Sequence, residues 1–112
     1  MKIESYSEPQ WRRAREQALR RDKYIDQYQK QFGRLRNAEM VHHIFPVEDF
    51  PQYALCMWNL ISLTRASHNL MHDRYTNELT DLGKDLLRRT AVKNNIPIPV
   101  DYLASPPGSA VR

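Results

Sequence analysis

The 112-residue chain has one cysteine, Cys56, and lacks any long apolar run. A single cysteine excludes an intrachain disulfide and any zinc site built from cysteine pairs. The apolar runs fall well short of the roughly 20 residues that span a membrane. The first ten residues, MKIESYSEPQ, lack the apolar segment of a secretion signal. These absences predict a cytoplasmic protein with no membrane partner.

The length of the chain predicts one domain, because it lies near the common domain size. The sequence has no internal repeat, and it becomes proline-rich after Asn95. We therefore expect a single domain over residues 1–103. Residues 104–112, ASPPGSAVR, are expected to form a flexible tail.

Positive charge is concentrated in one segment rather than spread along the chain. Residues 11–36 contain nine lysines and arginines against three acids, with aromatic residues between them. Such a segment is typical of a surface that contacts nucleic-acid phosphates, although a solvated helix face has the same composition. The arginines expected to contact phosphate are Arg12, Arg13, Arg15, Arg20 and Arg21, with Arg65 and Arg74 as further candidates.

The hydrophobic pattern predicts an α+β protein in which helices flank two strands. Ile25, Tyr28 and Phe32 keep the helical spacing of the first helix, which allows that helix to continue until Gly33. The expected elements are a basic helix (9–22), a strand (38–45), a connection (46–57), a second strand (58–64), a short helix (65–74) and an amphipathic helix (78–95).

All four histidines fall between residues 42 and 72. His68 and His72 are four residues apart, so on a helix their side chains would point the same way, about 6 Å apart, and could bind one metal ion. His42 or His43 could supply a third ligand. Neighbours in a regular strand point to opposite faces, so both would reach one site only through an irregularity near Pro46. Taken alone, the pair His68 and His72 could equally be a half-exposed polar pair on a helix.

Three segments of the sequence resemble the motif of the HNH endonucleases. They are EMVHHIFP (39–46), WNLISL (58–63) and SHNLMHDR (67–74). In that family a β-hairpin and a helix, the ββα-metal fold, hold one divalent ion. The resemblance covers residues 9–97 and is to small HNH proteins of phages and prophages. It implies a ββα-metal core between an N-terminal basic helix and a C-terminal amphipathic helix.

The resemblance also implies roles for individual residues. His43 would be the general base that activates water, and His42, His68 and His72 would hold the ion, which could be Mg²⁺, Mn²⁺, Ni²⁺ or Zn²⁺. Asn59 would orient the hairpin loop or the base by hydrogen bonding. The implied activity is DNA cleavage, by nicking or by a double-strand cut, with phage terminase subunits as further implied partners. The alternatives are a non-catalytic nucleic-acid-binding module of the same fold, an RNase, and a toxin-type nuclease.

One departure from the family pattern concerns a structural zinc. Many HNH proteins of this size carry two Cys-x-x-Cys pairs, and this chain has Asp26 and Gln29, then Thr64 and Ser67, at those places. The resemblance therefore implies that no structural zinc is bound. We expect packing of Trp11, Tyr24, Trp58 and the leucines of the last helix to take its place.

Overall fold

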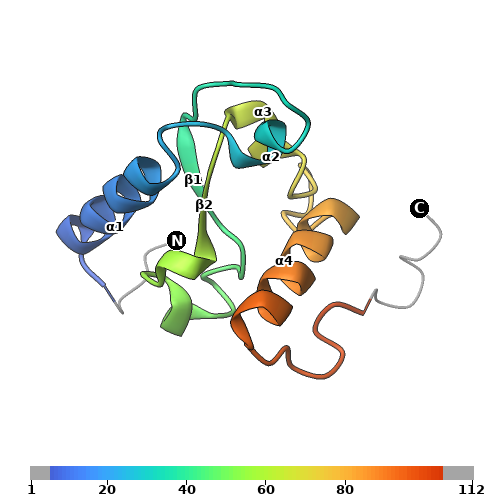
Figure 1. Ribbon diagram of the computed structural model, residues 1–112. Helices are drawn as coiled ribbons and strands as arrows, with labels where there is room; N and C mark the ends of the chain where they lie inside the picture. Colours follow the sequence, from blue (N-terminus) through green and yellow to red (C-terminus); the bar gives the residue numbers. More distant parts are fainter. Residues whose placement is uncertain (1–5, 105–112) are drawn as a thin grey trace.

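A β-hairpin lies at the centre of the molecule, with a long helix on each side (Figure 1). The computed structural model describes residues 6–104. The α+β class and the HNH arrangement of hairpin and helices are confirmed. The elements are α1 (Glu8–Arg21), α2 (Gln27–Lys30), β1 (Met40–His43), η1 (Pro51–Tyr53), η2 (Met57–Asn59), β2 (Leu60–Leu63), α3 (Arg65–Asn69) and α4 (Asp81–Asn94). Residues 105–112, most of the expected tail, lie outside the described residues.

Helix α1 begins one residue before Pro9, because Ser7 caps it. The Ser7 side chain accepts from the Gln10 backbone, and the Gln10 side chain accepts from the Ser7 backbone, which is a capping box. The helix does not continue to Gly33, so that expectation was wrong. Lys23 and Tyr24 have φ values of 56° and 58°, a left-handed conformation that ends a helix.

The hairpin pairs β1 with β2 in antiparallel register, from Met40 opposite Leu63 to His43 opposite Leu60. Both strands are shorter than the sequence predicts. The pairing is regular through His43, so the irregularity expected near Pro46 is not needed to explain the site. Side chains of β1 therefore alternate, and one face of the hairpin packs on α1 while α3 lies against the other.

Helix α3 ends at Asn69, five residues earlier than predicted. Two contacts from Thr80 stop it, since its hydroxyl donates to the Leu70 carbonyl and its backbone N–H to the Met71 carbonyl. The chain then turns, and His72 forms an isolated bridge with Leu79. The prediction that His68 and His72 share one helix face was therefore wrong.

Helix α4 approaches this turn closely. A Cβ atom at Gly83 would lie 2.4 Å from the Met71 carbonyl oxygen, so only glycine fits there without a shift. The buried face of α4 includes Leu87 and Ala91, which pack with Ile44, Phe45 and Phe50. Close packing of α4 thus supports the backbone directly before His72.

A second, smaller core joins α1 to the hairpin. Ala14 and Ala18 of α1 pack against Leu60, with Trp11 and Val41 at the margin. Among residues 6–104, no helix combines the length and apolar character needed to cross a membrane.

Four polar side chains lie at the positions where the family pattern has its zinc-binding cysteines. The Asp26 carboxylate accepts from the Thr64 backbone and hydroxyl at 2.8 and 2.7 Å, and the Gln29 side chain donates to the Ser67 hydroxyl at 3.5 Å. Tyr24 is 43% exposed. Trp11 and Trp58 pack against the two cores as expected, but Tyr24 is largely exposed, and hydrogen bonds join the four positions.

Candidate metal centre

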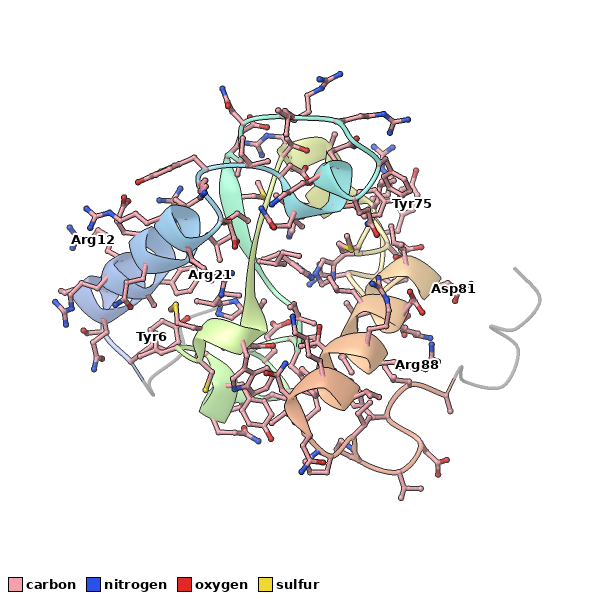
Figure 2. All side chains as sticks on the ribbon, in the orientation of Figure 1. Tyr6, Arg12, Arg21, Tyr75, Asp81 and Arg88 are labelled. Atoms are coloured by element: carbon pink, nitrogen blue, oxygen red, sulfur yellow. The ribbon has the colours of Figure 1, made fainter. Side chains whose placement is uncertain are left out.

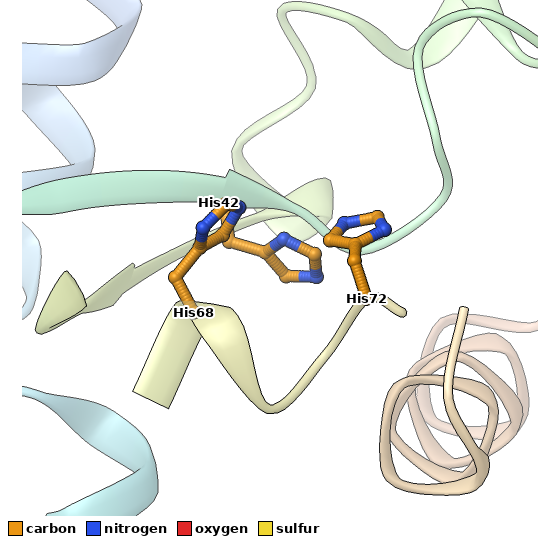
Figure 3. Close-up of side chains that lie close together, drawn as sticks. All are labelled: His42, His68 and His72. Atoms are coloured by element: carbon orange, nitrogen blue, oxygen red, sulfur yellow. The ribbon is translucent and has the colours of Figure 1, made fainter. Parts of the chain in front are cut away.

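Three imidazole rings meet between β1 and the segment that follows α3 (Figure 3). The ring centroids of His42, His68 and His72 lie 5.2–5.4 Å apart. One ring nitrogen from each residue can be chosen so that all three lie within 4.8 Å of one another. Three nitrogens at such distances can ligate one ion at about 2.1 Å each after small side-chain rotations.

The three histidines come from three different local structures. His42 is on the α3 face of β1, and His68 is in the last turn of α3. His72 lies beyond the helix, where its Nδ1 donates to the Asn77 carbonyl at 3.3 Å. Because Nδ1 then carries the proton, Nε2 of His72 keeps the lone pair that a metal ion requires.

The donor set fits a divalent cation. Nε2 of His42 is buried and has no hydrogen-bond partner among residues 6–104. A buried, unpaired nitrogen is costly, so it points to a missing ligand. Burial, followed by the neighbouring histidines His72, His68 and His43, holds the pKa of His42 well below its ordinary value. Burial, with His72 and Arg65, also lowers the pKa of His68. Neutral imidazole is the form that binds metal.

His43 is held apart from the three rings. Its imidazole stacks on the Trp11 indole of α1, with centroids 4.8 Å apart and planes at 27°. Its Nε2 lies 2.9 Å from the Ala54 carbonyl oxygen, which can only accept, so Nε2 carries the proton and Nδ1 is left as a free acceptor. Burial lowers the pKa of His43 despite the opposing effect of the Ala54 hydrogen bond.

Asn59 is fully buried and binds the connection between the strands. Its Oδ1 accepts from the Phe45 backbone N–H at 2.6 Å, and its Nδ2 donates to the carbonyls of Phe45 and Tyr53 at 3.1 and 3.2 Å. These bonds fix the start of the connection at Phe45 and also Tyr53, the residue before Ala54, which is the hydrogen-bond partner of His43. The side chain contacts backbone and does not reach the three rings.

An open cleft of about 320 Å³ gives access to the rings. His42, His43, His68 and His72 all line it, together with Val41, Pro46, Val47, Glu48 and Asn77. His43 therefore reaches the same cleft as the three clustered histidines although it points away from them. A group bound in the cleft could contact a metal ion and the His43 ring together.

One of three comparisons with known proteins found a match. No family model matches the chain, and no curated protein matches it. A crystal structure of the HNH endonuclease of the deep-sea thermophilic bacteriophage GVE2, with a manganese ion, does match. The two are 28% identical, with a TM-score of 0.53, over 77% of this chain and 74% of the phage chain. The chain is therefore similar in fold and in sequence to an HNH endonuclease.

The arginines of this protein fall into two groups. Arg12, Arg13 and Arg20 are exposed along α1, and Figure 2 shows Arg12 directed away from the sheet. Arg21 is also exposed, but its guanidinium donates to the carbonyls of Met57 and Leu60 and pairs with Asp22, so these contacts hold it against the fold.

The remaining predicted arginines are Arg15, Arg65 and Arg74. Arg15 is half-buried and contacts the Glu39 carbonyl at 3.5 Å. Arg65 and Arg74 are exposed at the two ends of the His68–His72 segment. The Arg74 guanidinium lies over the Tyr75 ring, 5.3 Å from its centroid. Sequence reasoning could not separate Arg21 from the others, since the separation depends on contacts with residues 36 or more positions away.

Proposed function

We propose that this protein is a metal-dependent DNA endonuclease. The observation that carries the proposal is the group of three imidazoles that includes the unpaired Nε2 of His42, with His43 lining the same cleft. His42, His68 and His72 would hold one divalent ion. The manganese ion of the phage GVE2 structure supports a divalent ion in this fold.

His43 is proposed as the general base. Its Nδ1 is free to accept a proton from a water molecule in the cleft, because Nε2 is bound to the Ala54 carbonyl. Burial keeps the imidazole neutral, and stacking on Trp11 holds the ring plane. A bound divalent ion supplies Lewis-acid stabilisation of the charge that develops on the scissile phosphate and the leaving oxygen.

Asn59 is proposed as a residue that supports the base. Its hydrogen bonds to Phe45 and Tyr53 fix the loop that presents the Ala54 carbonyl to His43. The exposed arginines Arg12, Arg13, Arg20, Arg65 and Arg74 are proposed to contact the phosphates of the substrate. Duplex DNA is the proposed substrate, and phage terminase subunits are proposed partners.

A plasmid-nicking assay tests the proposal. Supercoiled plasmid is incubated with metal-free protein and with added Mg²⁺, Mn²⁺, Ni²⁺ or Zn²⁺, for wild type and for His42→Ala. We expect conversion to nicked or linear plasmid that requires a metal ion and is lost in His42→Ala. A parallel single-stranded RNA substrate should be cleaved more slowly. Cleavage of RNA alone would indicate an RNase, and DNA binding without cleavage under any metal would indicate a non-catalytic module.

A further inference from the structure

A buried carboxylate lies outside the metal centre yet connects to it. Asp26 is fully buried, between α1 and α2, and is distant in sequence from all four histidines. Its oxygens accept from the Gln29 backbone at 2.8 Å, from the Thr64 backbone at 2.8 Å and from the Thr64 hydroxyl at 2.7 Å. A buried carboxylate is tolerated only with such a full set of donors. The Asp26 side chain therefore fixes the positions of three donor groups, one on Gln29 and two on Thr64.

Thr64 connects Asp26 to the start of α3 by two hydrogen bonds of its hydroxyl group. Its hydroxyl has one proton, which it donates to Asp26, so its lone pair is directed at the Ser67 backbone N–H, 3.1 Å away. This is the N-cap bond of α3, which spans only five residues. A helix that short has no stability of its own, so its direction is set by its caps and packing. The orientation of α3 thus depends on how Asp26 holds Thr64.

The placement of His68 depends on the orientation of α3. Ser67 is fully buried and receives a second contact from the Gln29 side chain at 3.5 Å. The next residue is His68, whose ring centroid lies 5.3 Å from that of His42. Binding sites tolerate displacements of only about 0.5 Å. A rotation of α3 about its cap would therefore separate the His68 nitrogen from the other two.

We propose that Asp26 is a positioning residue for the metal centre, acting through the Thr64 hydroxyl to set the placement of His68. The inference rests on the proposed binding of a divalent ion by His42, His68 and His72. Burial by itself would raise the pKa of Asp26, but hydrogen bonds from Ser67, Gln29 and Thr64 outweigh it and hold the pKa below its ordinary value. The carboxylate is therefore charged at neutral pH, which strengthens its bonds to Thr64.

The test compares Thr64→Val, which keeps the shape of the side chain and removes the hydroxyl, with Thr64→Ser, which keeps the hydroxyl. The affinity of each purified full-length variant for Mn²⁺ is measured by calorimetry at a temperature where circular dichroism shows it folded. We expect Thr64→Val and Asp26→Asn to weaken Mn²⁺ binding by about tenfold or more, the range seen when groups that orient metal ligands are removed. Thr64→Ser should bind like wild type.

Asp22→Asn is the matched control. Asp22 is also a largely buried carboxylate, and it accepts from the Ser62 backbone two residues before Thr64, but within residues 6–104 its side chain has no hydrogen bond to α3. We expect Asp22→Asn to lower the melting temperature and to leave Mn²⁺ affinity unchanged. Equal weakening of Mn²⁺ binding in Asp22→Asn and Asp26→Asn would overturn the inference, because loss of general stability would then explain both.

The remaining outcomes separate this inference from the proposed function. Wild-type affinity in both Thr64→Val and Asp26→Asn would overturn the inference, while loss of binding in His42→Ala would keep the proposed function intact. Absence of Mn²⁺ binding by wild type would overturn both proposals.

Discussion

His42 and His43 are adjacent in the chain, yet their rings lie on opposite faces of β1. The His42 ring meets His68 and His72, while the His43 ring stacks on Trp11 of α1. Regular strand alternation produces this separation, so no distortion is required. The two histidines can therefore carry separate tasks, metal binding for His42 and proton transfer for His43, while both line one cleft.

Replacing Asn59 with alanine is expected to destabilise the protein by about 3 kcal/mol. The substitution leaves the buried N–H and carbonyl of Phe45 without partners, and each unpaired buried group costs about 1–3 kcal/mol. The Tyr53 carbonyl keeps its bond from the Cys56 backbone N–H. Urea unfolding followed by circular dichroism measures the change. Asn69→Ala, at an exposed position of α3, is the control and should unfold like wild type. Unchanged stability in Asn59→Ala would contradict a supporting role.

The arginines of α1 are expected to separate by function. Changing exposed Arg12 and Arg13 to glutamate should weaken DNA binding and reduce the slope of log affinity against log salt by about two, since each lost phosphate contact lowers it by about 0.9. Fluorescence anisotropy at several salt concentrations measures this slope. An unchanged slope would mean that these arginines form only a solvated helix face.

Arg21→Ala is expected to act on stability. The substitution removes the donors to the carbonyls of Met57 and Leu60, so the free energy of unfolding should fall by about 1–2 kcal/mol. Thermal unfolding measures the loss. The result would be contradicted by an Arg21→Ala variant that keeps wild-type stability and loses DNA affinity instead.

Gly83→Ala is expected to destabilise the protein although alanine is the better helix former. Helix propensity favours alanine by about 1 kcal/mol, but the new Cβ would lie 2.4 Å from the Met71 carbonyl oxygen. Relief of that contact must shift α4 or the backbone before His72, so Mn²⁺ affinity should fall together with the melting temperature. Arg88→Ala, at an exposed site on the same helix, is the control. A higher melting temperature for Gly83→Ala would contradict the close packing described above.

Acid is expected to remove the contribution of Asp26 to stability. Its folded pKa lies below the ordinary value of 3.8, so the contribution is fully present above that value and is lost as the pH falls through the folded pKa. The difference in unfolding free energy between wild type and Asp26→Asn should thus be constant from pH 7 to about pH 5 and shrink below about pH 4. Urea unfolding at each pH measures it. A difference that does not change with pH would show that the pKa of Asp26 is the same in the folded and unfolded protein, which would contradict the lowered folded pKa.

Periodicity and turn residues were sufficient to predict the order of α1, the two strands, α3 and α4, and the segments that carry the histidines, but not α2. The leucine spacing predicted α4, and the apolar runs around His42 and Leu60 predicted the hairpin. The end of α3 was not predictable in this way, because contacts from Thr80, ten residues along the chain, end that helix. The route by which His72 reaches His68 was missed for the same reason.

The sequence marked the position of Asp26, but it did not show which groups Asp26 would bind. The spacing of Asp26, Gln29, Thr64 and Ser67 marked four positions that the family pattern brings together. Four polar residues at those positions were a signal of hydrogen bonding, yet only the coordinates reveal which donor meets which acceptor. Long-range polar contacts leave no periodicity in a sequence, whereas buried helix faces and strands do.

The central claim is that three imidazoles form one metal site and that His43 is separate from it. Calorimetric titration of metal-free protein with Mn²⁺, for wild type, His42→Ala and His43→Ala, tests this claim most directly. The account predicts one ion per chain in wild type, loss of binding in His42→Ala, and binding close to wild type in His43→Ala although that variant fails to nick plasmid. Equal loss of Mn²⁺ binding in both variants, or full retention in His42→Ala, would contradict it.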